Sequence, residues 1–261
     1  MGSYLDDLLR AAYERVAHDK SRRSQASVED AAHATQLPPS FRDALAAPGV
    51  AVIAEIKRAS PSKGPLAPEL DAVAQAKAYQ AGGAAAISVL TEPHWFKGSL
   101  GDLEAVSALG TPTLRKEFIV DAYQVFEARG AGASAVLLIA AALELSQLAE
   151  LHAAAQSVNL DVLVEVHDET EAEQVLTLGA DIIGVNARDL RSFTLDPDGF
   201  RRVRTLLPSH VTAVAESGVK TVDDVTRYAH DGADAILVGE QFVVSPRPET
   251  EVARFVAAGQ R

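Results

Sequence analysis

Short apolar runs alternate with amphipathic segments along most of this chain, beginning near residue 50. The apolar runs have the length and composition of buried strands, and they cover residues 50–56, 85–90, 113–115, 135–139, 162–166, 182–185, 212–215 and 235–238. Between and after these runs, helical spacing of apolar residues is clearest over residues 69–81, 122–129, 146–155, 169–178, 222–230 and 249–258. The pattern predicts eight strands, each followed by a helix.

An internal repeat supports this count. A Gly-Ala pair closes four of the predicted helices and leads within a few residues into a strand. The pairs lie at residues 83–84, 132–133, 179–180 and 232–233, so that their glycines are 49, 47 and 53 residues apart. Glycine suits the left-handed position at the end of a helix, and each interval spans about two strand–helix units. The fold class predicted is α/β, a (β/α)8 TIM barrel. A doubly wound open sheet is the alternative, but it more often carries a Gly-rich dinucleotide fingerprint after its first strand, and this chain has none there.

The N-terminal part of the chain shows helical patterns and no strand pattern. Apolar residues at helical spacing predict an amphipathic helix over residues 4–17. Ser27 followed by Asp30 resembles a capping box and predicts the start of a second helix, and a short third helix is expected over residues 40–46. The domains predicted are an N-terminal helical extension packed on the barrel, residues 1–48, and the (β/α)8 barrel catalytic domain, residues 49–261.

Composition narrows the class of protein. The chain has 261 residues, of which 48% are hydrophobic, which is enough for one large core. Its net charge of −12 argues against nucleic acid as a partner, because a phosphate backbone requires dense Lys and Arg, although a few local basic residues could still bind a small anion. The lack of cysteine excludes disulfides, thiolate zinc sites and cysteine nucleophiles. With no secretory signal pattern and no apolar run of membrane-spanning length, we expect a cytoplasmic protein with no membrane contact and no obligate protein partner.

Charged and polar residues stand at the ends of most predicted strands. The first strand carries Glu55 and is followed by Lys57, and the two share one face because side chains alternate along a strand. Two opposite charges on a buried strand are costly unless they pair or face a ligand. Five other predicted strands end in such residues: the third in Arg115-Lys116-Glu117, the fifth in Glu165 and His167, the sixth in Asn186 and Arg188, the seventh in Glu216-Ser217-Gly218 and the eighth in Gly239. Because a TIM barrel holds its active site at this end of its strands, we expect these groups to converge on one catalytic rim. The plainer alternative for the first strand is a structural ion pair followed by a surface turn.

The loops after the seventh and eighth strands suggest a phosphate site. They contain Ser217-Gly218 and Gly239, where glycine lets an anion approach backbone N–H groups closely. Barrels frequently bind phosphate in these two loops, and Arg188 and Lys57 could add positive charge. The alternative is that both glycines only form turns.

Two other features have weaker interpretations. Glu165 and His167 could be two metal ligands, but zinc or iron would need a third, and His94 lies on a loop. We therefore expect no metal, and we expect His167 to cap the helix that follows it. Trp95 and Phe96 could cover a ring-shaped ligand or simply close the top of the barrel.

Six motifs, in order and at matching spacing, resemble those of indole-3-glycerol phosphate synthase. They are Glu55-Ile-Lys57-Arg-Ala-Ser60-Pro-Ser62-Lys-Gly64, Thr91-Glu92 with Phe96-x-Gly98-Ser99, Leu114-Arg-Lys116-Glu-Phe-Ile119, Glu165-Val-His167, Gly184-Val-Asn186-Ala-Arg188-Asp-Leu190 and Ala215-Glu-Ser-Gly218. The first motif is highly specific to that family. The likeness covers nearly the whole chain, including the N-terminal extension.

The resemblance implies a carboxy-lyase of tryptophan biosynthesis. Its substrate would be the small phosphorylated molecule 1-(2-carboxyphenylamino)-1-deoxyribulose 5-phosphate, which is converted to indole-3-glycerol phosphate, carbon dioxide and water without a metal or organic cofactor. By resemblance, Lys116 is the general acid that protonates the carbonyl as the aromatic ring attacks it. Lys57 holds the substrate carboxylate and could share the acid role, and Glu165 takes part in proton removal and dehydration.

The resemblance also assigns supporting roles. Glu55 and Glu216 would tune the two lysines and position the anilino portion of the substrate, and Asn186 would orient the sugar hydroxyls. The residues implied in substrate binding, mostly at the phosphate end, are Ser60, Arg188, Ser217, Gly218 and Gly239.

Two positions depart from the family pattern. Where the family usually has Lys-Asp-Phe, this chain has Glu117, a longer carboxylate that could still pair with Lys116. After the eighth strand, Gly239 is followed by Glu240-Gln241-Phe242, so a phosphate contact there is expected through the backbone only.

Two rival functions make different demands on the sequence. A phosphoribosylanthranilate isomerase type of barrel would favour a Cys/Asp acid–base pair, and this chain has no cysteine. A non-catalytic phosphometabolite-binding protein would be expected to lack at least one of Lys57, Lys116 and Glu165, and all three are present.

Overall fold

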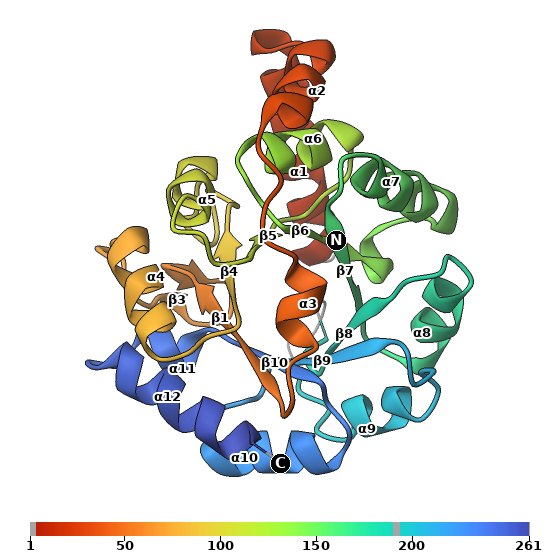
Figure 1. Ribbon diagram of the computed structural model, residues 1–261. Coiled ribbons are helices and arrows are strands. Elements are labelled where there is room, and N and C mark those ends of the chain that lie inside the picture. The colour runs from red at the N-terminus through yellow and green to blue at the C-terminus, as the bar shows by residue number, and fades with distance from the viewer. Residues whose placement is uncertain (1–3, 190–193, 261) are drawn as a thin grey trace.

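Parallel strands close into a barrel in the computed structural model, which describes residues 4–189 and 194–260 (Figure 1). The strands are β1 (Ala51–Ile56), β4 (Ala86–Leu90), β5 (Thr113–Lys116), β6 (Ala135–Ile139), β7 (Asp161–Val166), β8 (Ile182–Asn186), β9 (Thr212–Glu216) and β10 (Ala235–Val238). Each pairs in parallel with its neighbours in sequence, and β10 closes the ring against β1. The predicted (β/α)8 barrel is confirmed. A two-stranded antiparallel ribbon in the loop after β1, formed by β2 (Ala59–Ser60) and β3 (Gly64–Pro65), was not predicted.

Helices surround the barrel as an outer layer (Figure 1). They are α4 (Ala72–Ala81), α5 (Leu100–Ser107), α6 (Ala122–Gly130), α7 (Leu145–Ser157), α8 (Glu169–Leu176), α9 (Gly199–Arg204), α10 (Val222–His230) and α12 (Pro248–Gly259), with shorter turns at η1 (Ala140–Ala142) and α11 (Glu240–Val243). The four repeated glycines have φ angles of +87° at Gly83, +84° at Gly132, +72° at Gly179 and +88° at Gly232. They therefore adopt the left-handed conformation that the repeat predicted, which a side chain would disfavour.

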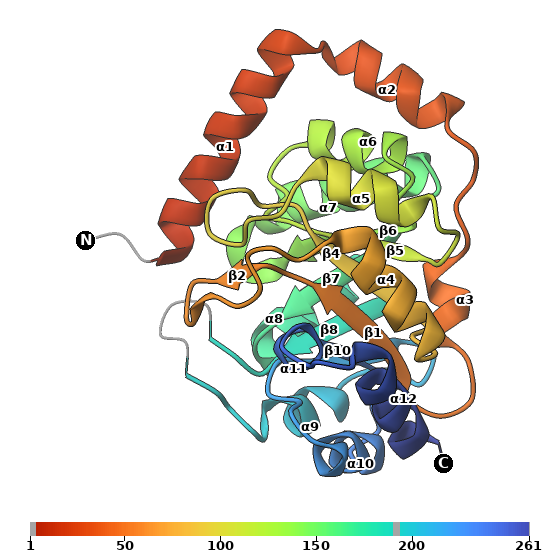
Figure 2. The same ribbon diagram turned by 90° about the vertical axis from the view of Figure 1, so that its left-hand side faces the viewer.

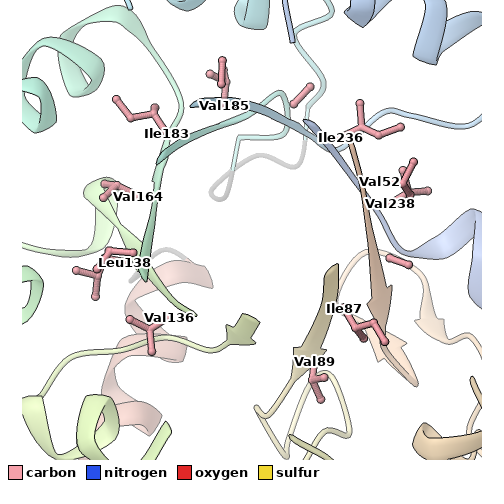
Figure 3. Packing of buried hydrophobic residues seen from close by; sticks show 14 of the residues in the cluster. Val52, Ile87, Val89, Val136, Leu138, Val164, Ile183, Val185, Ile236 and Val238 are labelled. Atoms are coloured by element: carbon pink, nitrogen blue, oxygen red, sulfur yellow. The ribbon is translucent and has the colours of Figure 1, made fainter. Parts of the chain in front are cut away.

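Each barrel strand separates two apolar layers. Val52, Val89 and Val164 belong to the layer between the strands and the helices, and Figure 3 shows these side chains pointing away from the barrel interior. The alternate residues, such as Ile53 and Leu163, belong to the interior cluster. This alternation places Glu55 on the interior face of β1, because it lies two residues after Ile53.

The N-terminal extension forms three helices, α1 (Tyr4–Arg22), α2 (Gln25–Ala34) and α3 (Phe41–Leu45). The predicted capping box is wrong: Ser24 is the N-cap of α2, and its side-chain oxygen accepts a hydrogen bond from the Ser27 N–H. Helix α1 extends farther than expected, so the connection to α2 is short and Ser27 already lies inside the second helix. The division of the chain into domains at residue 48 stays a prediction.

Helices α1 and α3 lie at opposite ends of the barrel (Figure 2). Phe41 and Leu45 of α3 are fully buried in the same interior cluster as Ile53. Asp161, the first residue of β7, accepts hydrogen bonds from the backbone N–H groups of Phe41 and Arg42, both at 3.0 Å. These N–H groups are in the first turn of α3, where a carboxylate also interacts favourably with the helix dipole. Helix α3 therefore closes the end of the barrel opposite the strand carboxyl ends.

No helix within residues 4–189 and 194–260 is both long enough and apolar enough to cross a membrane.

Candidate active site

A cavity of about 240 Å³ opens at the carboxyl ends of the strands. The predicted site residues that line it are Glu55, Lys57, Ser60, Lys116, Glu165, Asn186, Arg188, Glu216, Ser217, Gly218 and Gly239. The structure thus brings every one of the predicted site residues to one place. They come from segments as far apart in sequence as β1 and β10, which the barrel closure makes neighbours.

Lys116, at the end of β5, lies between two buried carboxylates. Its Nζ atom is 2.9 Å from Glu165 Oε2 and 3.2 Å from Glu216 Oε2. Together with Glu55, these residues come from the alternate strands β1, β5, β7 and β9. Alternate strands of a TIM barrel contribute side chains to the same interior layer, which explains why residues so distant in sequence meet.

The carboxylate of Glu216 requires a glycine on the neighbouring strand. A Cβ atom at Gly184 of β8 would lie 2.0 Å from Glu216 Oε1, so a side chain there would exclude the carboxylate from its position. Gly184 appears in one of the sequence motifs but was not predicted to be a site residue. Its role could be seen only after the β8–β9 register placed it opposite Val214 and beside Glu216.

Glu55 and Lys57 form the ion pair expected from the alternation of β1. Glu55 Oε1 lies 2.7 Å from Lys57 Nζ. A Cβ atom at Gly239 would lie 2.4 Å from Glu55 Oε1 and 2.9 Å from Lys57 Nζ. Gly239 is therefore required by the space that this pair occupies, besides any contact that its backbone makes to a ligand. The two residues therefore form a structural ion pair and also line the cavity.

Asn186 connects the carboxylate cluster to the loop after β9. Its Nδ2 atom donates a hydrogen bond to Glu165 Oε1 at 2.9 Å. Its Oδ1 atom accepts hydrogen bonds from Ser217 Oγ at 2.7 Å and from the backbone N–H of Arg188 at 3.0 Å. Both the nitrogen and the oxygen of this side-chain amide thus have partners, which fixes its orientation.

Burial and neighbouring charges set the pKa values in this cluster. Burial lowers the pKa of Lys116, but attraction by Glu165, Glu216 and Glu55 outweighs it and raises this pKa, so that Lys116 is protonated at neutral pH. Burial raises the pKa of Glu165, but Lys116 and His167 outweigh burial and hold it below its usual value. Burial raises the pKa of Glu216 to about 7, helped by the charges of Glu165 and Glu55 and opposed by Lys116. The site therefore holds one ionised carboxylate beside a second that titrates near neutrality.

His167 lies behind Glu165 and does not cap the following helix. The N-cap of α8 is Asp168, whose side chain accepts from the Glu171 N–H at 2.9 Å, so this prediction is wrong. The His167 ring lies between two carboxylates, with Nδ1 at 3.2 Å from Glu171 Oε2 and Nε2 at 3.5 Å from Glu165 Oε1. Burial lowers the pKa of His167, but the hydrogen bond to Glu171 and the charges of Glu165, Glu171 and Glu216 raise it overall. Within residues 4–189 and 194–260, no three His, Asp or Glu side chains are grouped so that they could hold a metal ion.

The apolar end of the cavity is formed partly by the N-terminal extension. Tyr4 and Leu8 of α1 line it together with Phe96 and Phe118 from the barrel. The rings of Phe96 and Phe118 lie 6.4 Å apart. Phe96 therefore lines the cavity, and its role in covering a ring-shaped ligand stays a prediction. The apolar face of α1 could be predicted from sequence, but which surface it covers depends on packing, so Tyr4 and Leu8 were missed.

The loop after β9 turns tightly at Ser217 and Gly218, which have φ angles of +66° and +77°. Backbone N–H groups in a tight turn can line a concavity that holds an anion. Both residues line the cavity, at the end where Gly239 and Arg188 also lie.

Glu117 does not pair with Lys116. Its carboxylate instead accepts hydrogen bonds from the Arg15 side chain of α1 at 3.0 Å, from the backbone N–H of the next residue, Phe118, at 2.9 Å and from the Thr91 hydroxyl at 2.9 Å. The chain turns after β5, so that consecutive side chains point to different sides and only Lys116 faces Glu165.

Sequence comparisons identify the family over nearly the whole chain. The profile of the family described as indole-3-glycerol phosphate synthase matches residues 5–255. The indole-3-glycerol phosphate synthase of Mycobacteroides abscessus is 48% identical over 259 residues, covering 99% of this chain and 95% of that protein. Indole-3-glycerol phosphate synthase 1 of Streptomyces coelicolor is 47% identical, covering 99% of this chain and 96% of that protein.

Solved structures share the fold at low identity. A 3-hexulose-6-phosphate synthase aligns with a TM-score of 0.65 and 20% identity over 80% of this chain and 99% of that one. An N-acetylmannosamine-6-phosphate 2-epimerase from Clostridium perfringens aligns with a TM-score of 0.62 and 14% identity over 86% of this chain and 99% of that one. These likenesses concern the barrel alone, whereas the family profile and the close relatives cover its site residues as well. The chain belongs to the indole-3-glycerol phosphate synthase family.

Proposed function

We propose that this chain converts 1-(2-carboxyphenylamino)-1-deoxyribulose 5-phosphate to indole-3-glycerol phosphate, carbon dioxide and water, as its family membership implies. Lys116 supports this reaction most strongly, because it stands protonated between two buried carboxylates on the wall of an open cavity. The lining of the cavity includes the aromatic side chains of Phe96 and Phe118 as well as the tight turn at Ser217 and Gly218, which could receive an anion. A substrate with an anilino ring and a phosphate matches this polarity.

Lys116 is the general acid in this proposal. As the ring carbon that bears the carboxylate attacks the ketone carbon, the ketone oxygen becomes negative and takes a proton from Lys116 Nζ. Glu165 and Glu216 hold the ammonium group in place. A positioned general acid of this kind contributes about 10²- to 10⁴-fold to a rate.

Lys57 and Glu55 act at the substrate carboxylate. The Lys57 ammonium group attracts this anion, and its pairing with Glu55 at 2.7 Å fixes where the charge sits. After the ring closes, the carbon–carbon bond to the carboxylate breaks. Carbon dioxide leaves, and the electron pair of the broken bond restores the aromatic ring.

Glu165 serves the final dehydration. The ionised carboxylate accepts the proton lost from the carbon next to the ring nitrogen, while the hydroxyl group leaves with a second proton as water. Two protons are taken up by the former ketone oxygen and one is released from carbon, so each turnover consumes one proton when the substrate carboxylate enters ionised. Asn186, which donates to Glu165 at 2.9 Å, would orient this base and the sugar hydroxyls.

The phosphate end of the substrate would lie against Ser217, Gly218 and Gly239, where backbone N–H groups can surround an anion. Arg188 supplies positive charge, and Ser60 reaches the substrate from the ribbon after β1. All of these residues line the same cavity. We propose no metal or organic cofactor for this chemistry, which needs only proton donors and acceptors.

The partners follow from the same proposal. The ligand is a small phosphorylated molecule, and a net charge of −12 disfavours nucleic acid. A biosynthetic role in the cytoplasm without a membrane or an obligate protein partner is the setting we propose.

Indole fluorescence gives a direct test. Purified protein is mixed with 1-(2-carboxyphenylamino)-1-deoxyribulose 5-phosphate, and the rise of indole emission is followed in time. We expect continuous product formation with uptake of one proton per product in weak buffer. Absence of product with enzyme at micromolar concentration would overturn the proposed function.

A further inference from the structure

Arg15 of α1 connects two buried carboxylates that belong to different barrel loops. Its Nη1 atom donates to Glu92 Oε1 at 3.2 Å and its Nη2 atom donates to Glu117 Oε1 at 3.0 Å. The side chains of Glu92 and Glu117 are 0% and 2% exposed, and that of Arg15 is 19% exposed. One guanidinium group thus joins α1 to two residues that lie 77 and 102 positions from Arg15 in the sequence.

Glu92 organises the loop between β4 and α5. Its two carboxylate oxygens accept hydrogen bonds from three successive backbone N–H groups, those of His94 at 2.9 Å, Trp95 at 2.6 Å and Phe96 at 3.1 Å. A carboxylate with this many donors holds the loop backbone in one conformation. Because Phe96 lines the cavity, the position of its ring depends on Glu92.

Glu117 does the same for the segment after β5. It accepts from the Phe118 N–H at 2.9 Å and from the Thr91 hydroxyl at 2.9 Å, and so joins this segment to the end of β4. Phe118 also lines the cavity. The backbone segments of Phe96 and Phe118 are therefore each held by a carboxylate that also accepts a hydrogen bond from Arg15.

Helix α1 completes this end of the cavity from the other side, with Tyr4 and Leu8. We propose that Arg15 is a positioning residue for substrate, which fixes the separation between α1 and the loops that carry Phe96 and Phe118 and thereby the space for the anilino ring. Arg15 does not line the cavity among the residues that the structure describes there, so it acts through Glu92 and Glu117. The inference rests on the proposed function only in naming the ring that fills this space.

Arginine suits this role better than lysine. Its planar fork presents separate N–H donors to two carboxylates at once, whereas the lysine ammonium is a single point of charge on a flexible stem. The longer Glu117, in place of the Asp usual in the family, carries its carboxylate one methylene farther from the backbone and within reach of α1. Arg15→Lys is therefore expected to retain charge but lose part of the bridge.

Trp95 provides a readout that needs no substrate. It is the single tryptophan of the chain. Its backbone N–H is held by Glu92, and its ring meets that of Tyr4 on α1 edge-on at 6.0 Å between centroids. In Arg15→Met we expect Trp95 emission to move to longer wavelength and acrylamide quenching to increase, because α1 no longer covers the loop. Arg10→Met is the matched control, since Arg10 lies on the same helix and pairs with Asp7 at the surface, and it should leave the emission unchanged.

Kinetics separate positioning from simple stabilisation. A variant that only lowers stability reduces the folded fraction near its melting temperature, which lowers the apparent kcat there but leaves KM unchanged at every temperature. Loss of the aligned ring pocket should instead raise the KM of Arg15→Met by about tenfold or more, with a smaller rise for Arg15→Lys.

In Arg15→Met, the buried carboxylates of Glu92 and Glu117 both lose the contact with Arg15. The double variant Arg15→Met with Glu117→Gln removes one of these two negative charges. We expect its melting temperature to recover toward that of the wild type while its KM stays raised. Wild-type Trp95 emission and KM in Arg15→Met, or recovery of KM along with the melting temperature in the double variant, would overturn the positioning role. A wild-type protein without synthase activity would overturn the proposed function instead, and the Trp95 measurement would still decide whether Arg15 holds α1 to the barrel.

Discussion

Replacing Lys116 with methionine removes the cation between two buried carboxylates while keeping a side chain of similar length. The Nζ atom lies 2.9 Å from Glu165 Oε2 and 3.2 Å from Glu216 Oε2. At an effective dielectric constant of about 20, these separations correspond to attractions of roughly 6 and 5 kcal/mol. The cost of burying the lysine charge offsets most of that attraction.

The net loss of stability is smaller than these attractions. Breaking a buried ion pair by removing one partner costs about 3–5 kcal/mol. Because the pKa of Glu216 already stands at about 7, this carboxyl group can bind a proton at little cost once the cation is gone. We therefore expect Lys116→Met to lose about 3 kcal/mol of unfolding free energy, at the lower end of that range.

The loss of activity should be larger than the loss of folded protein. Removing the general acid is expected to lower kcat by at least about 10²-fold, and by up to 10⁴-fold, which corresponds to about 3–5 kcal/mol of activation free energy. Substrate should still bind, because the loop of Ser217 and Gly218 is untouched. Indole fluorescence measures turnover, isothermal titration measures binding, and urea unfolding measures stability.

Two matched variants identify the cause. Lys116→Arg restores a cation beside the carboxylates, but its guanidinium group does not release a proton at neutral pH, so stability should recover while turnover does not. Lys77→Met, at an exposed position of α4, should change neither. A Lys116→Met enzyme that keeps a tenth of the wild-type kcat, or a Lys116→Arg enzyme with full turnover, would refute the role of Lys116 as the acid.

Four further outcomes are expected. The pKa of Glu216 predicts that kcat/KM falls as pH rises through about 7, because ionised Glu216 repels the anionic substrate. Glu216→Gln should lack this fall in kcat/KM, and a pH profile unchanged by the substitution would contradict the attribution of the fall to Glu216. His167→Asn removes a positive charge beside Glu165 and should raise the pKa of that base, which shifts the acid limb of the kcat–pH profile upward; a profile identical to wild type would exclude the effect. Gly239→Ala places a Cβ 2.4 Å from a carboxylate oxygen and should raise KM, which steady-state assays measure. Phe41→Ala, at a fully buried position of α3, should lower the free energy of unfolding measured in urea by about 3–5 kcal/mol, while kcat is retained at low temperature. Loss of kcat without loss of stability would contradict the structural role of Phe41.

The barrel itself was predictable because strand and helix periodicities differ. Every predicted strand is present, since a buried parallel strand leaves an uninterrupted apolar run in the sequence. The glycines that end alternate helices marked the repeat, because a left-handed backbone at that position selects glycine. The ribbon β2–β3 was missed, since its two-residue strands, Ala59–Ser60 and Gly64–Pro65, are too short to show a period.

The site residues of the barrel were also predictable, because a carboxylate or lysine at the end of a buried strand stands out against apolar neighbours. Gly184 carried no such signal. A glycine in a strand is ambiguous until its neighbours are known, and only the proximity of Glu216 Oε1 shows why a Cβ is excluded. Tyr4 and Leu8 looked like ordinary residues of an amphipathic helix.

By itself, the sequence determined the alternation of strands and helices, the polar strand ends and the motifs of the family. These features depend on local periodicity and residue type, so they can be read along the chain. Only the tertiary structure decided that α1 covers the cavity, and that Glu117 pairs with Arg15 at 3.0 Å and not with Lys116. Such pairings depend on the direction in which each side chain leaves the backbone and on which distant surface packs against it, and neither is encoded in the spacing of residues.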